Sequence, residues 1–187
     1  TISSENFEYL GNPSSIHWAG RKAKALVDNA RDTIAEALGL EDPDSLLFTS
    51  SATEATNTAL KGFFFSHQNS TRRVCFLSTQ VEHEATLETL RFLEREGAVV
   101  TLLPVNSEGE LSIADFERAL SSYEKSDAVL VSMLAANNET GVLFPWEKAV
   151  DLTAKKDLTF HLDAVQSFGK DPDFTLRGRK ILASLSA

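Results

Sequence analysis

The sequence predicts an α/β fold with a mainly parallel sheet and helices on both faces. Short apolar runs alternate with stretches of helical periodicity along most of the 187 residues. The connections between these segments are short, which is typical of right-handed strand–helix–strand crossovers. Polar residues follow several of the apolar runs, and in such folds ligands bind beyond the carboxyl ends of the strands.

Composition and charge limit the classes of function. Hydrophobic residues make up 42% and charged residues 24% of the chain, so we expect one globular domain. The formal net charge of -9 argues against a nucleic-acid partner, and no apolar run is long enough to predict a membrane span. The only cysteine, Cys75, lies in an apolar run. It can form no internal disulfide and fits a reducing compartment, so we predict a cytoplasmic protein.

The first part of the chain predicts two helices and a short strand. Apolar residues recur at helical spacing over residues 16–38. Residues 46–49 form a short apolar run that predicts a strand. Ser51 and Glu54 have the spacing of a capping box, so a second helix is expected to start there and to end near Phe65.

The rest of the chain alternates regularly between strands and helices. The predicted strands cover residues 74–77, 98–103, 128–134 and 158–162, and the predicted helices cover 82–97, 112–120 and 146–155. A final apolar run occupies residues 180–185. This alternation is the pattern of parallel strands joined by helical crossovers.

Three loops that follow predicted strands carry polar residues with more than one possible role. Residues 50–53 stand at a helix N-terminus, where hydroxyls and backbone N–H groups either cap the helix or cradle a phosphate. His83 is either a surface histidine or a flat ring that stacks on a ligand. Asn137 and Asn138 suit a turn, and they also suit an amide contact with a ligand.

The strand at residues 158–162 leads to Asp163 and Gln166. Aspartate is a common turn residue, but all four loops reach the same edge of a parallel sheet. A phosphate cradle, an acid, an amide donor and an imidazole together suit a phosphorylated aromatic ring, and pyridoxal phosphate fits that description. A carboxylate beside its ring nitrogen would keep the ring protonated and a better electron sink. No metal site is predicted.

These segments are similar, in order and spacing, to the large domain of the cysteine desulfurases. That family belongs to the class V aminotransferase group of pyridoxal-phosphate enzymes, which have fold type I. The matching segments are residues 11–15 with His17, 48–54 with Asn57, 82–83, 137–141, and 161–167 with Gly169 and Lys170. Each motif is weak alone, and the combination is specific.

The resemblance implies a role for each matched residue. Its implied phosphate ligands are Ala52, Thr53 and Ser186. His83 would stack on the cofactor ring and transfer protons. Asn138 would lie near the ring oxygen and bind the substrate carboxylate.

Three further residues have implied roles. Asp163 would pair with the pyridinium nitrogen, and Gln166 would donate to the phenolic oxygen of the ring. Asn12 would contact the substrate.

The resemblance implies that the intact protein is a cysteine desulfurase. L-cysteine would give up its sulfur to a protein thiolate as a persulfide and leave as alanine, for iron–sulfur cluster assembly or other sulfur transfer. Family members are homodimers, and a sulfur-acceptor or scaffold protein is the implied partner. The alternatives are a selenocysteine lyase or another class V aminotransferase, and a non-catalytic fragment that binds partners.

We expect residues 1–187 to form a single but incomplete large domain. The first strand of the family, its Schiff-base lysine and its smaller C-terminal domain have no match in the chain. Lys170 and Lys180 do not match that lysine. The chain alone is therefore expected to be inactive.

Overall fold

The computed structural model describes residues 11–186, whose contacts group into two compact units. Unit 1 contains residues 11–48 and Thr175–Gly178, and unit 2 contains Thr49–Phe174 and residues 179–186. The single domain expected over residues 1–187 stays a prediction. Across residues 11–186, every helix is too short or too polar to cross a membrane.

Unit 1 is built around helix α1, Trp18–Leu38. The helix ends at Gly39, which has a φ of 71° and so adopts the left-handed conformation that glycine tolerates best. A 3-10 turn, η2, follows at Pro43–Ser45. The strand predicted at 46–49 is wrong, because within residues 11–186 this segment pairs with no strand, and the carbonyl of Leu46 accepts from the Arg31 guanidinium instead.

Unit 2 is built around a five-stranded parallel sheet in the order β2-β1-β3-β4-β5. The strands are β1 Val74–Thr79, β2 Val99–Leu103, β3 Ala128–Leu134, β4 Thr159–Asp163 and β5 Leu182–Ser184. Every residue of β1 and β3 is buried, which is typical of central strands covered on both faces. The predicted parallel α/β sheet is confirmed.

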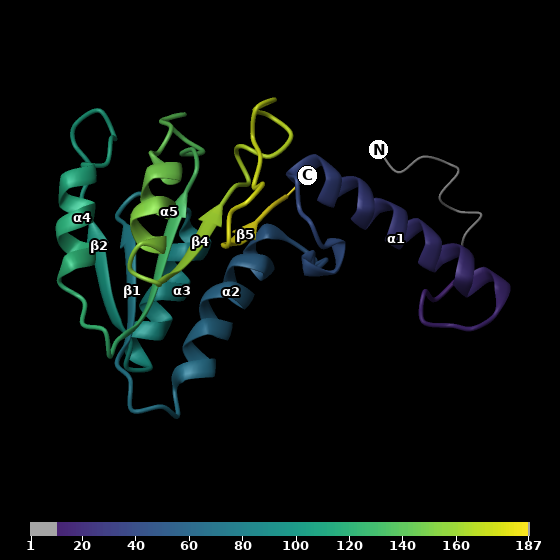
Figure 1. Ribbon diagram of the computed structural model, residues 1–187, viewed down its shortest axis with the longest axis horizontal. Coiled ribbons are helices and arrows are strands. Elements are labelled where there is room, and N and C mark those ends of the chain that lie inside the picture. Colours follow the sequence, from purple (N-terminus) through teal and green to yellow (C-terminus); the bar gives the residue numbers. More distant parts are fainter. Residues whose placement is uncertain (1–10, 187) are drawn as a thin grey trace. The chain divides into compact units, whose positions relative to one another are not determined.

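Helices cover both faces of this sheet, as predicted (Figure 1). Helices α2, Ala52–His67, and α3, Glu84–Arg95, pack together on one face, and α4, Ile113–Ser121, and α5, Trp146–Ala154, pack together on the other. The predicted helix over 82–97 is shorter at both ends than expected. Its first residues form the turn that precedes α3.

A compact apolar cluster fixes α2 and α3 to the sheet. It is made of buried side chains from both helices, from β1 and β3, and from the residue just before β2, namely Leu60, Phe64, Val74, Phe76, Leu90, Leu93, Ala98 and Leu130. Burying one leucine or phenylalanine stabilises a fold by about 1.5–3 kcal/mol. The first turns of both helices are thereby held at the carboxyl edge of the sheet.

The order of the strands creates a switch point beside β1. From β1 the chain crosses to β2 on one side, whereas β3 lies on the other side. Loops that leave β1 and β3 therefore diverge, and a crevice opens between them at the carboxyl edge. The candidate site lies at this edge.

Candidate functional site

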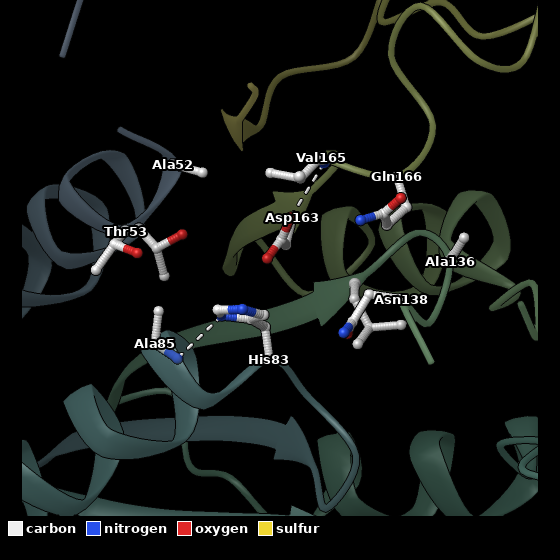
Figure 2. Close-up of a pocket in the computed structure, with 11 residues that line it drawn as sticks. Ala52, Thr53, His83, Ala85, Ala136, Asn138, Asp163, Val165 and Gln166 are labelled. Atoms are coloured by element: carbon white, nitrogen blue, oxygen red, sulfur yellow. Dashed lines mark hydrogen bonds between the residues drawn. The ribbon is translucent and has the colours of Figure 1, made fainter. Parts of the chain in front are cut away.

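A pocket lies at the carboxyl edge of the sheet in unit 2 (Figure 2). Four regions line it: the start of α2, the start of α3, the end of β3 with its loop, and the end of β4 with its loop. The lining residues are Ala52, Thr53, Thr56, His83, Ala85, Leu134, Ala136, Asn138, Asp163, Val165 and Gln166. Six of the residues predicted as site residues from the sequence thus meet in one pocket.

The first turn of α2 presents backbone N–H groups to the pocket. Ser51 caps the helix, because its Oγ accepts from Glu54 N at 3.2 Å. The Glu54 carboxylate turns back and accepts from Ser50 N and Oγ at 2.6 and 2.7 Å, and these bonds lower its pKa. The N–H groups of Ala52 and Thr53 have no acceptor within the helix, so this end favours an anion.

His83 caps helix α3 and faces the pocket. Its Nδ1 accepts from Ala85 N at 3.1 Å. A neutral imidazole has one donor and one acceptor nitrogen, so the proton lies on Nε2. The cap therefore fixes both the ring orientation and the tautomer.

Asp163 ends β4 and is half-buried. Its Oδ1 accepts from Val165 N at 3.1 Å. Burial raises the pKa of this carboxyl, while that hydrogen bond and the nearby His83 oppose the rise. Among residues 11–186 no lysine or arginine forms an ion pair with Asp163. A cationic ligand group would supply the missing partner.

The loop after β3 is tied to the turn after β1. Asn137 Nδ2 donates to the carbonyl of Val81 at 3.0 Å, and its Oδ1 accepts from the backbone N–H groups of Glu139 and Thr140. Asn138, the next residue, is exposed and lines the pocket. Asn137 therefore acts as the turn residue of the pair, and Asn138 is left to face the pocket.

Glu82 is a buried acid in one of the matched segments, but the sequence assigned it no role. It is 5% exposed, its Oε1 accepts from Thr79 Oγ1 at 2.7 Å, and its Oε2 has no hydrogen-bond partner among the described residues. Burial, reinforced by the charge of Asp163, raises its pKa to about 8. Glu82 is thus largely protonated at neutral pH. A glutamate at the start of a predicted helix carries no sequence signal of such burial.

A buried polar row crosses the sheet beneath the pocket. His161 Nδ1 and Nε2 lie 2.9 and 2.8 Å from the hydroxyls of Ser132 and Ser184, which joins β3, β4 and β5. Burial lowers the pKa of His161 to about 4, so the ring is neutral. His161 is two residues from Asp163 and shares its face of β4. The row holds the strand that presents Asp163.

Two predicted site residues are not among the lining residues of the pocket. Ser186 is half-buried and follows β5, the strand that pairs with β4. Asn12 belongs to unit 1, where its Oδ1 accepts from Ser14 N at 2.9 Å in a turn. The roles expected for both residues stay predictions.

The profile of the family described as Aminotransferase class-V matches residues 2–174. The chain belongs to this family. Among its relatives, cysteine desulfurase IscS of Dictyoglomus turgidum is 40% identical over 165 residues, which cover 88% of this chain and 40% of the relative. The mitochondrial cysteine desulfurase of Candida maltosa is 38% identical over 163 residues, which cover 87% of this chain and 32% of the relative.

Solved structures of similar proteins share the fold. A NifS-like protein has a TM-score of 0.86 and 36% identity, over 96% of this chain and 48% of its own. A protein described as SspA in complex with cysteine has a TM-score of 0.86 and 29% identity, over 99% of this chain and 54% of its own. The resemblance found in the sequence is confirmed. The chain spans about two fifths of the length of the curated relatives it matches.

Class-V aminotransferases and cysteine desulfurases depend on pyridoxal phosphate. The described residues fit this group on two observations. The half-buried carboxylate of Asp163 has no cationic partner among residues 11–186, and the protonated ring nitrogen would be one. Ala52 and Thr53 at the start of α2 line the same pocket, and a first helical turn has free backbone N–H groups that would bind a phosphate there.

Proposed function

We propose that the intact protein is a pyridoxal-phosphate-dependent cysteine desulfurase, which releases alanine from L-cysteine and keeps the sulfur as an enzyme persulfide. The sulfur would serve iron–sulfur cluster assembly or another transfer pathway. The observation that carries the proposal is the convergence of Asp163, His83, Asn138 and Gln166 on one pocket that begins at the α2 N-terminus. The names of the relatives support the choice of substrate.

The bound cofactor would supply an electron sink for bond cleavage in the amino acid. Asp163 would hold a proton on the ring nitrogen through its negative charge. Its pKa is raised by burial, and an adjacent cation would stabilise the ionised form. The Val165 N–H would hold the carboxylate in place, and the hydrogen bonds of His161 with Ser132 and Ser184 would hold β4 itself.

His83 would stack on the ring and move protons. Its Nδ1 is committed to the α3 cap, so Nε2 is the nitrogen that can exchange a proton with the substrate. Asn138 would bind the substrate carboxylate, and the substrate contact expected of Asn12 stays a prediction. The phosphate would bind to Ala52 and Thr53, with Ser186 as a third ligand.

The proposal extends to partners and location. We propose a homodimer, a sulfur-acceptor or scaffold protein as partner, and a cytoplasmic location, which the buried unpaired thiol of Cys75 supports. The 187 residues alone are proposed to be inactive, because none of them matches the Schiff-base lysine or the persulfide cysteine that the resemblance implies.

The test is a product assay on the intact protein loaded with pyridoxal phosphate. Alanine and sulfide are measured after addition of L-cysteine together with a thiol reductant, which reduces the enzyme persulfide and releases its sulfur as sulfide, and selenocysteine is compared as a substrate. Equimolar alanine and sulfur released from cysteine would support the proposal. Turnover of selenocysteine alone, or amino transfer without sulfur release, would favour the other class V activities.

A further inference from the structure

The loop after β4 contains a lysine that contacts two pocket residues. Lys170 Nζ donates to Gln166 Oε1 at 2.7 Å and to the carbonyl of Val165 at 2.9 Å. Gln166 and Val165 line the pocket, whereas Lys170 is exposed and does not. The Lys170 ammonium therefore contacts two lining residues of the pocket without lining the pocket itself.

Backbone geometry explains how Lys170 reaches back to these residues. The carbonyl of Ser167 accepts from Lys170 N at 3.1 Å and from Asp171 N at 2.9 Å, which closes a tight turn. Gly169, within this turn, has a φ of 73°, a conformation that favours glycine. The turn folds the lysine side chain over the start of its own loop.

The ammonium determines which way the Gln166 amide points. A lysine ammonium only donates hydrogen bonds, so the atom of Gln166 that faces it must be the amide oxygen. The amide nitrogen then lies on the other side of the group, and Figure 2 shows it directed toward Asp163 and the pocket. A flipped amide would place N–H donors against a positive charge.

Lys170 also supports the acid. The Val165 carbonyl accepts from Lys170, and the Val165 N–H donates to Asp163 Oδ1 at 3.1 Å. The Lys170 ammonium thus contacts the amide oxygen of Gln166 directly. It also binds the carbonyl of Val165, the residue whose N–H donates to Asp163.

We propose that Lys170 is a positioning residue that holds Gln166 with its amide nitrogen toward the ring oxygen of the cofactor. The proposal rests on the proposed function, because the acceptor is the phenolic oxygen of pyridoxal phosphate. Lys170 itself does not contact the cofactor. An N–H donor stabilises the anionic oxygen, so a misdirected amide leaves that oxygen more basic.

The test is a pH titration of the visible absorbance of the cofactor in the intact protein. We expect Lys170→Met to raise the pH midpoint by about 0.5 to 1 unit, a roughly three- to tenfold change in proton affinity. Lys170→Arg should restore most of the midpoint, since it keeps donors at this position. Lys156→Met, which removes an exposed lysine ahead of β4, should leave the midpoint unchanged. A Lys170→Met titration that superimposes on the wild type would overturn the proposal.

A double variant separates positioning from the loss of charge. Gln166→Ala should raise the midpoint at least as much as Lys170→Met, and Lys170→Met should add nothing further in that background. An equal shift from Lys170→Met with and without Gln166 would show that the lysine acts through its charge alone, and would overturn the proposal.

A second readout does not depend on the cofactor. In the cofactor-free intact protein, Lys170→Met should speed amide hydrogen exchange across residues 164–171, and Lys156→Met should not. If the wild type lacked a visible cofactor band, the proposed function would fail, while faster exchange would still support the lysine contacts. Unchanged exchange would contradict them.

Discussion

At the scale of single residues, two buried titratable side chains near the pocket have opposite effects on stability. Burial raises the pKa of Glu82 to about 8, so the folded state holds its proton over a pH range in which the unfolded state releases it. The contribution of Glu82 is full below its unfolded pKa and is lost as pH rises to about 8. Burial lowers the pKa of His161 to about 4, so its contribution is full above its unfolded pKa and is lost as pH falls to about 4.

The first prediction concerns Glu82. Between about pH 6.5 and 8 the raised pKa of Glu82 should make the unfolding free energy fall by up to about 1.4 kcal/mol per pH unit. Glu82→Gln, which keeps the shape and the contact with Thr79, should remove this slope. Urea unfolding of the intact protein at several pH values measures it. An unchanged slope in the variant would show that Glu82 is not the group responsible.

The histidine accounts for the second prediction. Between about pH 4.5 and 6.5 a rise in pH lowers stability through Glu82 and increases it through His161. The two contributions should largely cancel in the wild type. His161→Gln removes the opposing effect, and stability should then fall as pH rises through this range. Urea unfolding of His161→Gln at the same pH values shows whether its stability falls or rises with pH. A gain in stability with pH in the variant would contradict the account.

At the scale of elements, the cap of α2 connects stability to the site. Ser51→Ala should lower stability by about 1 kcal/mol, because Glu54 N loses its acceptor, and should weaken cofactor binding several-fold by loosening the first turn. Ser112→Ala is a matched control, since Ser112 Oγ accepts from Asp115 N at the same 3.2 Å at the start of α4. Thermal unfolding and cofactor dissociation constants measure both effects. Equal loss of cofactor affinity in both variants would reject the role of the α2 cap.

Local patterns predicted most of these elements. The spacing of Ser51 and Glu54 predicted the start of α2, although the glutamate closes on Ser50 rather than on the cap itself. The segment 46–49 has the composition of a strand but has no strand to pair with in the part of the chain that the structure describes. Strand formation depends on that tertiary partner, which no local pattern reveals.

At the scale of the whole molecule, topology explains why the pocket residues could be predicted. His83 and Asn138 each follow a parallel strand, Asp163 ends another, and parallel strands end at one edge. The protonated state of Glu82 and the contacts of Lys170 depend on burial and loop geometry. The burial of Glu82 arises from packing between segments, and the Lys170 contacts arise within one turn whose shape the residue types alone did not predict.

The activity of the 187 residues alone is a prediction at this scale. With pyridoxal phosphate and L-cysteine, the isolated chain should release no alanine above a cofactor-only control. Borohydride treatment followed by mass measurement should find no cofactor attached to a lysine. A covalent adduct on Lys170 or Lys180 would overturn the assignment of the missing lysine.

The most direct test of the central claim is the activity of Asp163→Ala in the intact protein. Without a carboxylate at the ring nitrogen, alanine release from L-cysteine should fall by about 100-fold or more. Asp163 is half-buried and accepts one backbone hydrogen bond, so circular dichroism should show the fold retained. Near-normal alanine release from this variant would contradict the assignment of Asp163, and with it the proposed site.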